Sequence, residues 1–273
     1  MLGDSKMKSR LDKLLVEKGF CRTRSQARDI IRLGRVKING KVHVKPGTLI
    51  NHNCDISVER RKYVNRAAEK LEHALKKLSI VFESRTVCDI GASTGGFTQV
   101  ALIHGARKVY AVDVGKDQLA DEIRKDKRVV VLERVNARYL SRNLLGERVD
   151  VVLCDVSFIS VVKVLPAIRS ILKSDGNALV LVKPQFEVGP EYLHHGLVQD
   201  FSKHREAIMS IVFEALQNDL NACNIVTSDL PGANGNFEYF LHLSSSHELN
   251  IITEEKVIEV INAARKMHRG ELL

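Results

Sequence analysis

Hydrophobic residues follow two different patterns along this chain, namely short, mostly apolar runs and apolar residues at helical spacing. Five mostly apolar runs are typical of strands covered on both faces of a parallel sheet, and they lie at 86–90, 108–114, 129–135, 149–155 and 178–184. Other segments carry apolar residues at helical spacing, at about 66–78, 98–105, 118–125, 161–173, 202–218 and 254–267. Two further strands, joined by a turn-rich loop, are predicted near 223–228 and 237–243. The alternation predicts an α/β fold with a mainly parallel sheet and an antiparallel finish.

The N-terminal part carries a smaller and different pattern. Three leucines share one face of a predicted helix that runs from Arg10 to about Gly19, and a second helix follows with Thr23 or Ser25 as its cap. Alternating residues around Asn39-Gly40 then predict a β-hairpin with a tight turn. This part therefore has the pattern of a compact unit of two helices and a few short strands.

The basic charge of the chain is confined to this part. Residues 1–60 hold 14 Lys and Arg against 6 Asp and Glu, a net charge of +8, whereas residues 61–273 hold 28 against 27. Together with the length of 273 residues, this division predicts a small α+β domain at 1–60 and a full α/β domain at 61–273. A positive module of this kind is typical of a protein that binds a phosphate backbone, and the alternative is a basic domain that is merely soluble.

The composition disfavours several other classes of protein. No apolar run approaches the ~18–20 residues needed to cross a bilayer, and the first residues show no signal peptide, so a cytoplasmic protein without membrane contact is expected. Five cysteines are scattered without a Cys-x-x-Cys pair. We therefore expect reduced thiols and no bound metal.

One loop between a predicted strand and a predicted helix combines an acid with three glycines. Asp89 lies in the strand, and Gly91, Gly95 and Gly96 follow it. In an open α/β sheet such a loop lies where small ligands bind, and glycines let the backbone approach them. The spacing Gly-x-x-x-Gly-Gly matches neither a dinucleotide fold nor a phosphate-binding loop, which disfavours a diphosphate ligand. Asp113, at the tip of the next strand, supplies a carboxylate that can accept hydrogen bonds from a ribose diol.

The N-terminal pattern resembles the S4 RNA-binding domain. The resemblance covers about residues 9–59, from Arg10-Leu11-Asp12 through an arginine-rich helix to Val36-Lys37-Ile38-Asn39-Gly40. It implies that RNA is bound by a set of basic side chains, namely Arg10, Arg22, Arg24, Arg28, Arg32, Lys37 and Lys41. For any one of these residues, a solvated helix or strand face is the alternative.

The glycine loop, taken with Asp113, resembles the cofactor site of class I methyltransferases, which have a Rossmann-like sheet. The resemblance implies S-adenosyl-L-methionine as the cofactor. It also implies a set of contacts to that cofactor, from Asp89, Gly91, Ser93, Gly95, Gly96, Phe97, Asp113, Asn136 and Asp155. An ordinary glycine-rich loop is the alternative.

Two further strand tips, at Asp155-Val156-Ser157-Phe158 and Lys183-Pro184-Gln185-Phe186, resemble the FtsJ-like ribose 2′-O-methyltransferases. The catalytic Lys-Asp-Lys-Glu tetrad of that family maps onto Lys70, Asp155, Lys183 and Glu238. With its S4-like part, the whole chain resembles the TlyA family, known both as hemolysin A and as ribosomal RNA 2′-O-methyltransferase. This resemblance implies methylation of a cytidine ribose in ribosomal RNA, within ribosomal subunits, with Lys183 as the base.

The chain departs from the family at one place. Asn65-Arg66-Ala67-Ala68 stands where Ser-Arg-Gly-Gly is usual before the first lysine, which predicts a stiffer helix under Lys70. Asp155 and Lys183 have simpler alternatives as a turn residue and a solvated lysine. Two other functions are left open, namely a membrane-damaging hemolysin, for which the sequence shows no insertion element, and an RNA-binding scaffold with an inactive methyltransferase fold.

Overall fold

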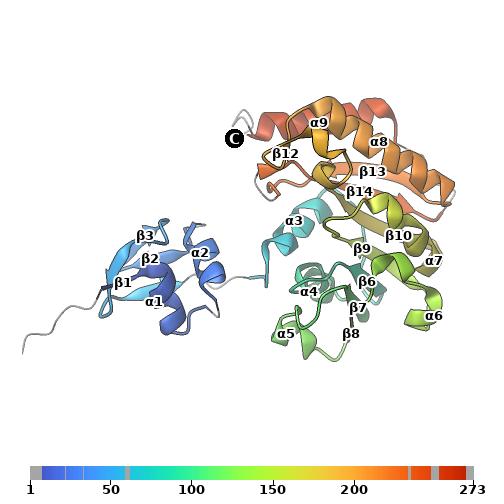
Figure 1. Ribbon diagram of the computed structural model, residues 1–273. Coiled ribbons are helices and arrows are strands. Elements are labelled where there is room, and N and C mark those ends of the chain that lie inside the picture. Colours follow the sequence, from blue (N-terminus) through green and yellow to red (C-terminus); the bar gives the residue numbers. More distant parts are fainter. Residues whose placement is uncertain are drawn as a thin grey trace, which may run out of the picture. The chain divides into compact units, whose positions relative to one another are not determined.

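The chain forms two compact units, residues Met1–Lys62 and Tyr63–Leu273. The computed structural model describes residues 8–21, 23–32, 34–58, 62–232, 235–246 and 252–268 (Figure 1). The domain boundary predicted between residues 60 and 61 lies outside these described residues. Each unit has a hydrophobic core of its own, so each is described separately.

The first unit packs two helices against short antiparallel strands. Its elements are β1 (Lys8–Arg10), α1 (Leu11–Glu17), α2 (Arg24–Arg32), β2 (Val36–Ile38), β3 (Lys41–His43), β4 (Leu49–Asn51) and β5 (Ile56–Val58). The leucine face of α1 is buried against Ala27, Ile30 and Ile31 of α2, as the periodicity predicted. The Thr23 hydroxyl accepts a hydrogen bond from the Gln26 N–H, which confirms one of the two predicted caps. The pairing of β1 with β4 was not predicted, because runs of three residues carry too little periodicity.

The second unit is built on a seven-stranded sheet, which confirms the predicted α/β class. Its strand order among the described residues is β13-β14-β10-β9-β6-β7-β8. The strands are β6 (Thr86–Ile90), β7 (Lys108–Asp113), β8 (Val129–Glu133), β9 (Val149–Cys154), β10 (Leu172–Val182), β13 (Asn221–Thr227) and β14 (Tyr239–Ser244). The five strands from β10 to β8 are parallel, while β14 pairs antiparallel with β10 and with β13. The antiparallel finish is therefore also confirmed.

Helices cover both faces of this sheet because alternate strand residues point to opposite sides. One face carries α3 (Arg66–Leu75) and α4 (Gly96–Ile103), and α5 (Asp121–Arg124) packs in a small cluster beside them. The other face carries α7 (Leu165–Ile171), α8 (Phe201–Gln217) and α9 (Glu254–His268), with the short α6 (Arg142–Leu145) beside α7. Figure 1 shows α8 and α9 lying together beside β13 and β14.

Two segments differ from the prediction. The helix expected at 161–173 is a 3-10 turn (Val161–Lys163) followed by α7, because Pro166 suits only the first turn of a helix. The segment at 185–200, which showed no periodicity, forms 3-10 turns and a two-stranded hairpin of β11 (Leu193–His194) and β12 (Leu197–Val198). The Asn236 side chain ties this hairpin to the loop before β14, because its amide donates to the Gly196 carbonyl at 2.8 Å.

Candidate active site

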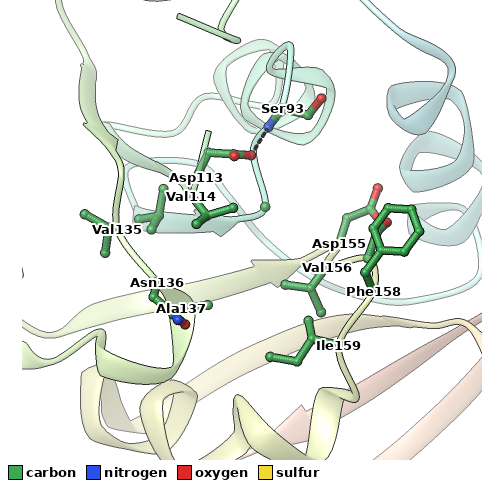
Figure 2. Close-up of a pocket in the computed structure, with 13 residues that line it drawn as sticks. Ser93, Asp113, Val114, Val135, Asn136, Ala137, Asp155, Val156, Phe158 and Ile159 are labelled. Atoms are coloured by element: carbon green, nitrogen blue, oxygen red, sulfur yellow. Dashed lines mark hydrogen bonds between the residues drawn. The ribbon is translucent and has the colours of Figure 1, made fainter. Parts of the chain in front are cut away.

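A pocket opens where the strand order reverses. From β6, the chain adds β7 and β8 on one side and β9 and β10 on the other, so the carboxyl ends of β6 and β9 diverge into a crevice. The pocket has a volume of about 420 Å³. Its lining comes from the ends of four adjacent strands and the loops that follow them, namely Gly91, Ser93, Val112, Asp113, Val114, Val135, Asn136, Ala137, Asp155, Val156, Ser157, Phe158 and Ile159. Figure 2 shows Asp113, Val114 and Val135 on one side, with Asp155 and Phe158 on the other.

Gly91 is required where the two central strands separate. Its φ of +82° lies in the left-handed region, and a Cβ there would lie 2.5 Å from the backbone oxygen of Asp155. Any other residue would therefore push β6 and β9 apart at the mouth of the pocket. The predicted role of Gly91 in letting a ligand approach the backbone is consistent with its place in the lining.

Five of the nine predicted cofactor residues line the pocket, and these are Gly91, Ser93, Asp113, Asn136 and Asp155. The other four lie behind the lining. Gly95 precedes α4, and Gly96 and Phe97 begin it, with Phe97 buried against Phe240. Asp89 is fully buried in β6. In the structure these four residues shape the glycine loop and the start of α4.

Asp113 is held in place by the glycine loop. Its Oδ2 accepts a hydrogen bond from the Ser93 N–H at 2.8 Å, and its Oδ1 accepts one from the Gly115 N–H at 2.7 Å (Figure 2). Each carboxylate oxygen has a second lone pair, so both can still accept from a ligand. The carboxylate is therefore a fixed, two-pronged acceptor at the pocket wall.

Asp89 is hydrogen-bonded to the first turn of α4. Its Oδ2 accepts hydrogen bonds from the backbone N–H and the hydroxyl of Thr98, at 2.8 and 2.6 Å, while its Oδ1 is buried without a hydrogen-bond partner among the described residues. Burial raises the pKa of Asp89 to about 7, the bonds from Thr98 oppose this rise, and the charges of Asp155 and Asp113 add to it. Ionising this buried carboxyl group therefore costs free energy in the folded protein.

We expect an effect of Asp89 on stability that depends on pH. The unfolded chain ionises Asp89 near pH 4 and the folded chain near pH 7, so this residue's contribution to the free energy of unfolding falls as pH rises through that window. Asp89→Asn should remove the fall, which is roughly 4 kcal/mol at most. Denaturant unfolding of wild type and variant at pH 4, 5.5 and 7.5 measures the difference, with the exposed Glu122→Gln as control. Parallel curves for wild type and Asp89→Asn would contradict this account.

The four residues of the predicted tetrad form two ion pairs. Lys70 Nζ lies 2.5 Å from Glu238 Oε2, with the two side chains only 7% and 3% exposed. Lys183 Nζ lies 2.6 Å from Asp155 Oδ1, with exposures of 11% and 18%. The residues come from α3, the tips of β9 and β10, and the residue just before β14. Each lysine is therefore neutralised by a carboxylate from a different element.

Lys183 and Asp155 lie close together but do not form a hydrogen bond with each other. The approach to Asp155 Oδ1 does not have hydrogen-bond geometry, and that buried oxygen has no hydrogen-bond partner among the described residues. Lys183 instead donates to the Ser157 hydroxyl at 2.8 Å. The ammonium group is thus held between Asp155 and Ser157, beside the pocket lining, and Asp155 retains capacity to accept a further hydrogen bond.

The carboxylate of Glu187 supports the loop after β9, and this role was not predicted from the sequence. It accepts hydrogen bonds from the Ser160 hydroxyl at 2.6 Å and the Val161 N–H at 2.9 Å, and burial raises its pKa. Phe158, also missed, is 91% exposed with a φ of +62°, and its ring lies 5.1 Å from that of Phe186. An apolar residue at a strand tip gives no sign in the sequence that it will be exposed.

Room for Glu238 depends on Gly232. A Cβ on this glycine would overlap the Glu238 carboxylate. The loop closes through a hydrogen bond from the Gly232 N–H to the Asn236 carbonyl at 2.7 Å. The turn-rich loop after β13 therefore has a structural reason for its glycine.

The structure places Lys70 on a well-formed helix. Asn65 caps α3 by accepting the Ala68 N–H at 3.3 Å, and its amide donates to the Thr94 hydroxyl at 2.7 Å. Ala68 is fully buried. The departure from the family pattern thus falls on a packed helical turn that is tied to the glycine loop.

Most of the predicted RNA-binding residues lie on the surface of the first unit. Arg10, Arg24 and Arg28 all approach Asp12, while Arg32, Lys37 and Lys41 are exposed. Arg22 lies outside the described residues. Three of the predicted arginines therefore form one group around a carboxylate.

Within the ranges given above, no group of three or more His, Cys, Asp or Glu side chains has the arrangement of a metal site. No helix in the described part of the chain is long and apolar enough to span a membrane.

Comparison with known proteins matches both units. Residues 63–245 match the FtsJ-like methyltransferase family model and residues 9–53 match the S4 domain model. The chain is 42% identical over 240 residues to the 16S/23S rRNA (cytidine-2'-O)-methyltransferase TlyA of Mycobacterium tuberculosis, covering 86% of this chain and 90% of that protein. It is also 38% identical to Hemolysin A of Brachyspira hyodysenteriae, with 85% and 98% covered.

A solved structure from Streptococcus thermophilus, provisionally described as a hemolysin, superposes with a TM-score of 0.79. It is 35% identical, and the match covers 98% of this chain and 99% of that one. The predicted class I methyltransferase sheet and the predicted family are thereby confirmed. The chain belongs to the TlyA family and joins an S4 domain to an FtsJ-like methyltransferase domain.

Proposed function

We propose that this protein transfers a methyl group from S-adenosyl-L-methionine to a ribose 2′-hydroxyl of ribosomal RNA, with a cytidine in a ribosomal subunit as the target. The observation that carries the proposal is the pair of lysine–carboxylate contacts, one of which lies at the wall of the pocket. The names of the relatives support the nucleotide and the position, since one of them is a 16S/23S rRNA (cytidine-2'-O)-methyltransferase.

The pocket suits the proposed cofactor. Asp113 offers the two acceptors that a ribose diol requires, and the apolar side chains of Val114, Val135 and Ile159 can cover the faces of an adenine ring. Asp155 adds a negative charge that favours a positively charged sulfonium. The volume of about 420 Å³ falls within the usual range for a small-molecule site, which is roughly 300–1,000 Å³.

The chemistry divides between the cofactor and the protein. When bound, the cofactor would be held by Asp113 and the glycine loop and would supply an electrophilic methyl carbon to the ribose oxygen, with its sulfur keeping the electron pair of the bond that breaks. Lys183, as the neutral amine, takes the proton that the hydroxyl loses, because its Nζ lies beside Asp155 and Ser157, which line the pocket. Lys70 and Glu238 form the second buried pair and hold the geometry around the nucleophile.

Phe158 supports an RNA substrate. An aromatic side chain that is 91% exposed at the rim of a pocket offers a face on which an unstacked base can lie. Its ring is steadied by Phe186, which follows Lys183 in the chain. A nucleotide turned out of its helix could thus present its ribose to the pocket.

Asp113→Ala should weaken cofactor binding by roughly 10–100-fold, because a charged acceptor contributes about 1.5–3 kcal/mol per hydrogen bond. Titration calorimetry with S-adenosyl-L-methionine measures the change. Asp113→Asn should fall between wild type and Asp113→Ala, since it keeps one acceptor. The exposed Glu122→Ala on α5 is the control and should bind as wild type does. Equal affinity in wild type and Asp113→Ala would remove Asp113 from the site.

Lysis of membranes is the rival function, and the name of the Brachyspira relative is the observation that favours it. Dye release from liposomes by the purified protein tests it directly. Membrane lysis would replace the proposed function if wild type transfers no methyl groups and dye release persists in a Lys183→Ala variant. Methyl transfer without dye release supports it.

A further inference from the structure

Asp12 is a buried carboxylate within the most basic part of the chain. It lies in the first turn of α1 and is 0% exposed, although it lies near the protein surface rather than deep in the core. Its Oδ1 accepts from Arg10 Nε at 3.1 Å, and its Oδ2 accepts from Arg24 at 2.9 Å. Arg28 Nε lies 3.7 Å from the same Oδ2, within ion-pair distance.

The three arginines face both the carboxylate and the solvent. Their side chains are 51%, 51% and 47% exposed, in the order Arg10, Arg24 and Arg28. Burial opposes ionisation of Asp12, but the hydrogen bonds and charges of Arg10 and Arg24 outweigh it and lower its pKa. Asp12 is thus ionised at neutral pH, and three guanidiniums against one carboxylate leave this cluster positive.

Each guanidinium carries five N–H donors in a planar fork, and Asp12 engages only some of them. The remaining donors project from one surface patch, since the forks of Arg10 and Arg24 are hydrogen-bonded to Asp12 and that of Arg28 lies within ion-pair distance of it. Phosphate oxygens accept from such forks in pairs. The cluster therefore has the features of a phosphate-binding surface whose side chains are ordered before the ligand arrives.

We propose that Asp12 is a positioning residue, which holds Arg10, Arg24 and Arg28 as a preformed grip on RNA phosphates. The proposal rests on the RNA-binding function proposed above and adds the reason for a carboxylate at its centre. An ordered grip loses less side-chain freedom on binding than three free arginines would. Asp12 then strengthens binding to a polyanion although it carries a negative charge.

Positioning of the arginines and net charge alone predict opposite effects of Asp12→Asn on RNA affinity. If only net charge mattered, Asp12→Asn would make the surface more positive, tighten RNA binding and steepen its salt dependence. If Asp12 positions the arginines, Asp12→Asn should weaken binding by about fivefold to thirtyfold and flatten the salt dependence, because fewer arginines reach phosphates.

The test measures binding of the full chain to purified ribosomal subunits over a series of salt concentrations. Glu17→Gln is the matched control, because it removes one carboxylate from the same helix, where Glu17 is 39% exposed and pairs with Lys13. This control should bind as tightly as wild type or slightly more tightly. Asp12→Asn that binds as tightly as wild type, or more tightly, would overturn the proposal.

A second pair of variants decides the matter if Asp12→Asn fails to fold. Arg24→Lys keeps the charge but loses the fork, at a half-exposed position where the core is not disturbed. Arg142→Lys makes the same change at an exposed position on α6, outside the predicted set of RNA-binding residues. Weaker binding by Arg24→Lys alone supports the proposal, and wild-type binding by both overturns it.

A third variant separates positioning from a general loss of structure. In a background with Arg10, Arg24 and Arg28 all changed to Ala, Asp12→Asn should have no further effect on RNA affinity. An undiminished effect there would overturn the proposal. If wild type itself binds ribosomal subunits with no salt dependence, the RNA-binding function falls with it, and this result is distinct from those above.

Discussion

Lys183→Ala is expected to lower methyl transfer to ribosomal RNA by between about 10²- and 10⁴-fold, the range for loss of a general base. Binding of S-adenosyl-L-methionine should be nearly unchanged, because Asp113 and the glycine loop hold the cofactor while Lys183 acts on the nucleophile. Single-turnover transfer of labelled methyl groups to ribosomal subunits measures the rate, and calorimetry measures cofactor affinity. The exposed Lys163→Ala, in the turn before α7, is the control and should react as wild type does.

Lys183→Arg separates the role of base from the role of charge. A guanidinium keeps its proton at any pH at which the enzyme works, so it can pair with Asp155 but cannot take the proton of the hydroxyl. We expect this variant to be nearly as inactive as Lys183→Ala. Near wild-type single-turnover rates in Lys183→Arg would show that position 183 supplies only charge, and the base would have to be another group.

Lys70→Met is expected to destabilise the second unit by roughly 3–5 kcal/mol, because it leaves the Glu238 carboxylate buried without its partner. The double variant Lys70→Met with Glu238→Leu should recover most of that stability, since an apolar pair of similar volume replaces the ion pair. Methyl transfer should be lost in both variants. Urea unfolding and the transfer assay, done on the same preparations, measure the two effects.

Lys77→Met is the control for this pair of variants. Lys77 pairs with Asp229 at 2.6 Å, but its side chain is 41% exposed, so its loss should cost no more than about 1 kcal/mol. A double variant that is stable and also transfers methyl groups at the wild-type rate would remove Lys70 and Glu238 from the catalytic tetrad. A stable Lys70→Met single variant would contradict the burial of the pair.

The parts of the fold that could be predicted are those set by local periodicity. The strand at Thr86–Ile90 is uniformly buried, and its apolar run placed it correctly. The long α8, with its apolar face, was placed to within one residue at each end. Among the short elements, β1 and β4 were missed, because they are defined by their pairing with each other and not by any pattern in either segment.

The candidate site also has some residues whose position the sequence predicts and some contacts that it does not predict. Gly91, Asp113 and Asp155 follow consecutive or adjacent strands, so the topology of a parallel sheet brings them to one edge. The contact of Lys70 with Glu238 joins residues 168 positions apart, and only the family resemblance indicated it. The burial of Asp12 depends on arginines that lie 12 and 16 residues further along, so the pattern of α1 alone could not reveal it.

The most direct test of the proposed reaction is the chemical position of the methyl group on RNA. Unmodified ribosomal subunits are incubated with the purified full chain and methyl-labelled S-adenosyl-L-methionine, and the RNA is then hydrolysed with alkali. A 2′-O-methyl group blocks attack of that oxygen on the adjacent phosphate, so the label should remain in alkali-stable dinucleotides whose first nucleoside is cytidine. Label released in mononucleotides would place the methyl group on a base, and absence of label would leave the fold without the proposed activity. Either result would contradict the assignment of ribose 2′-O-methylation to this protein.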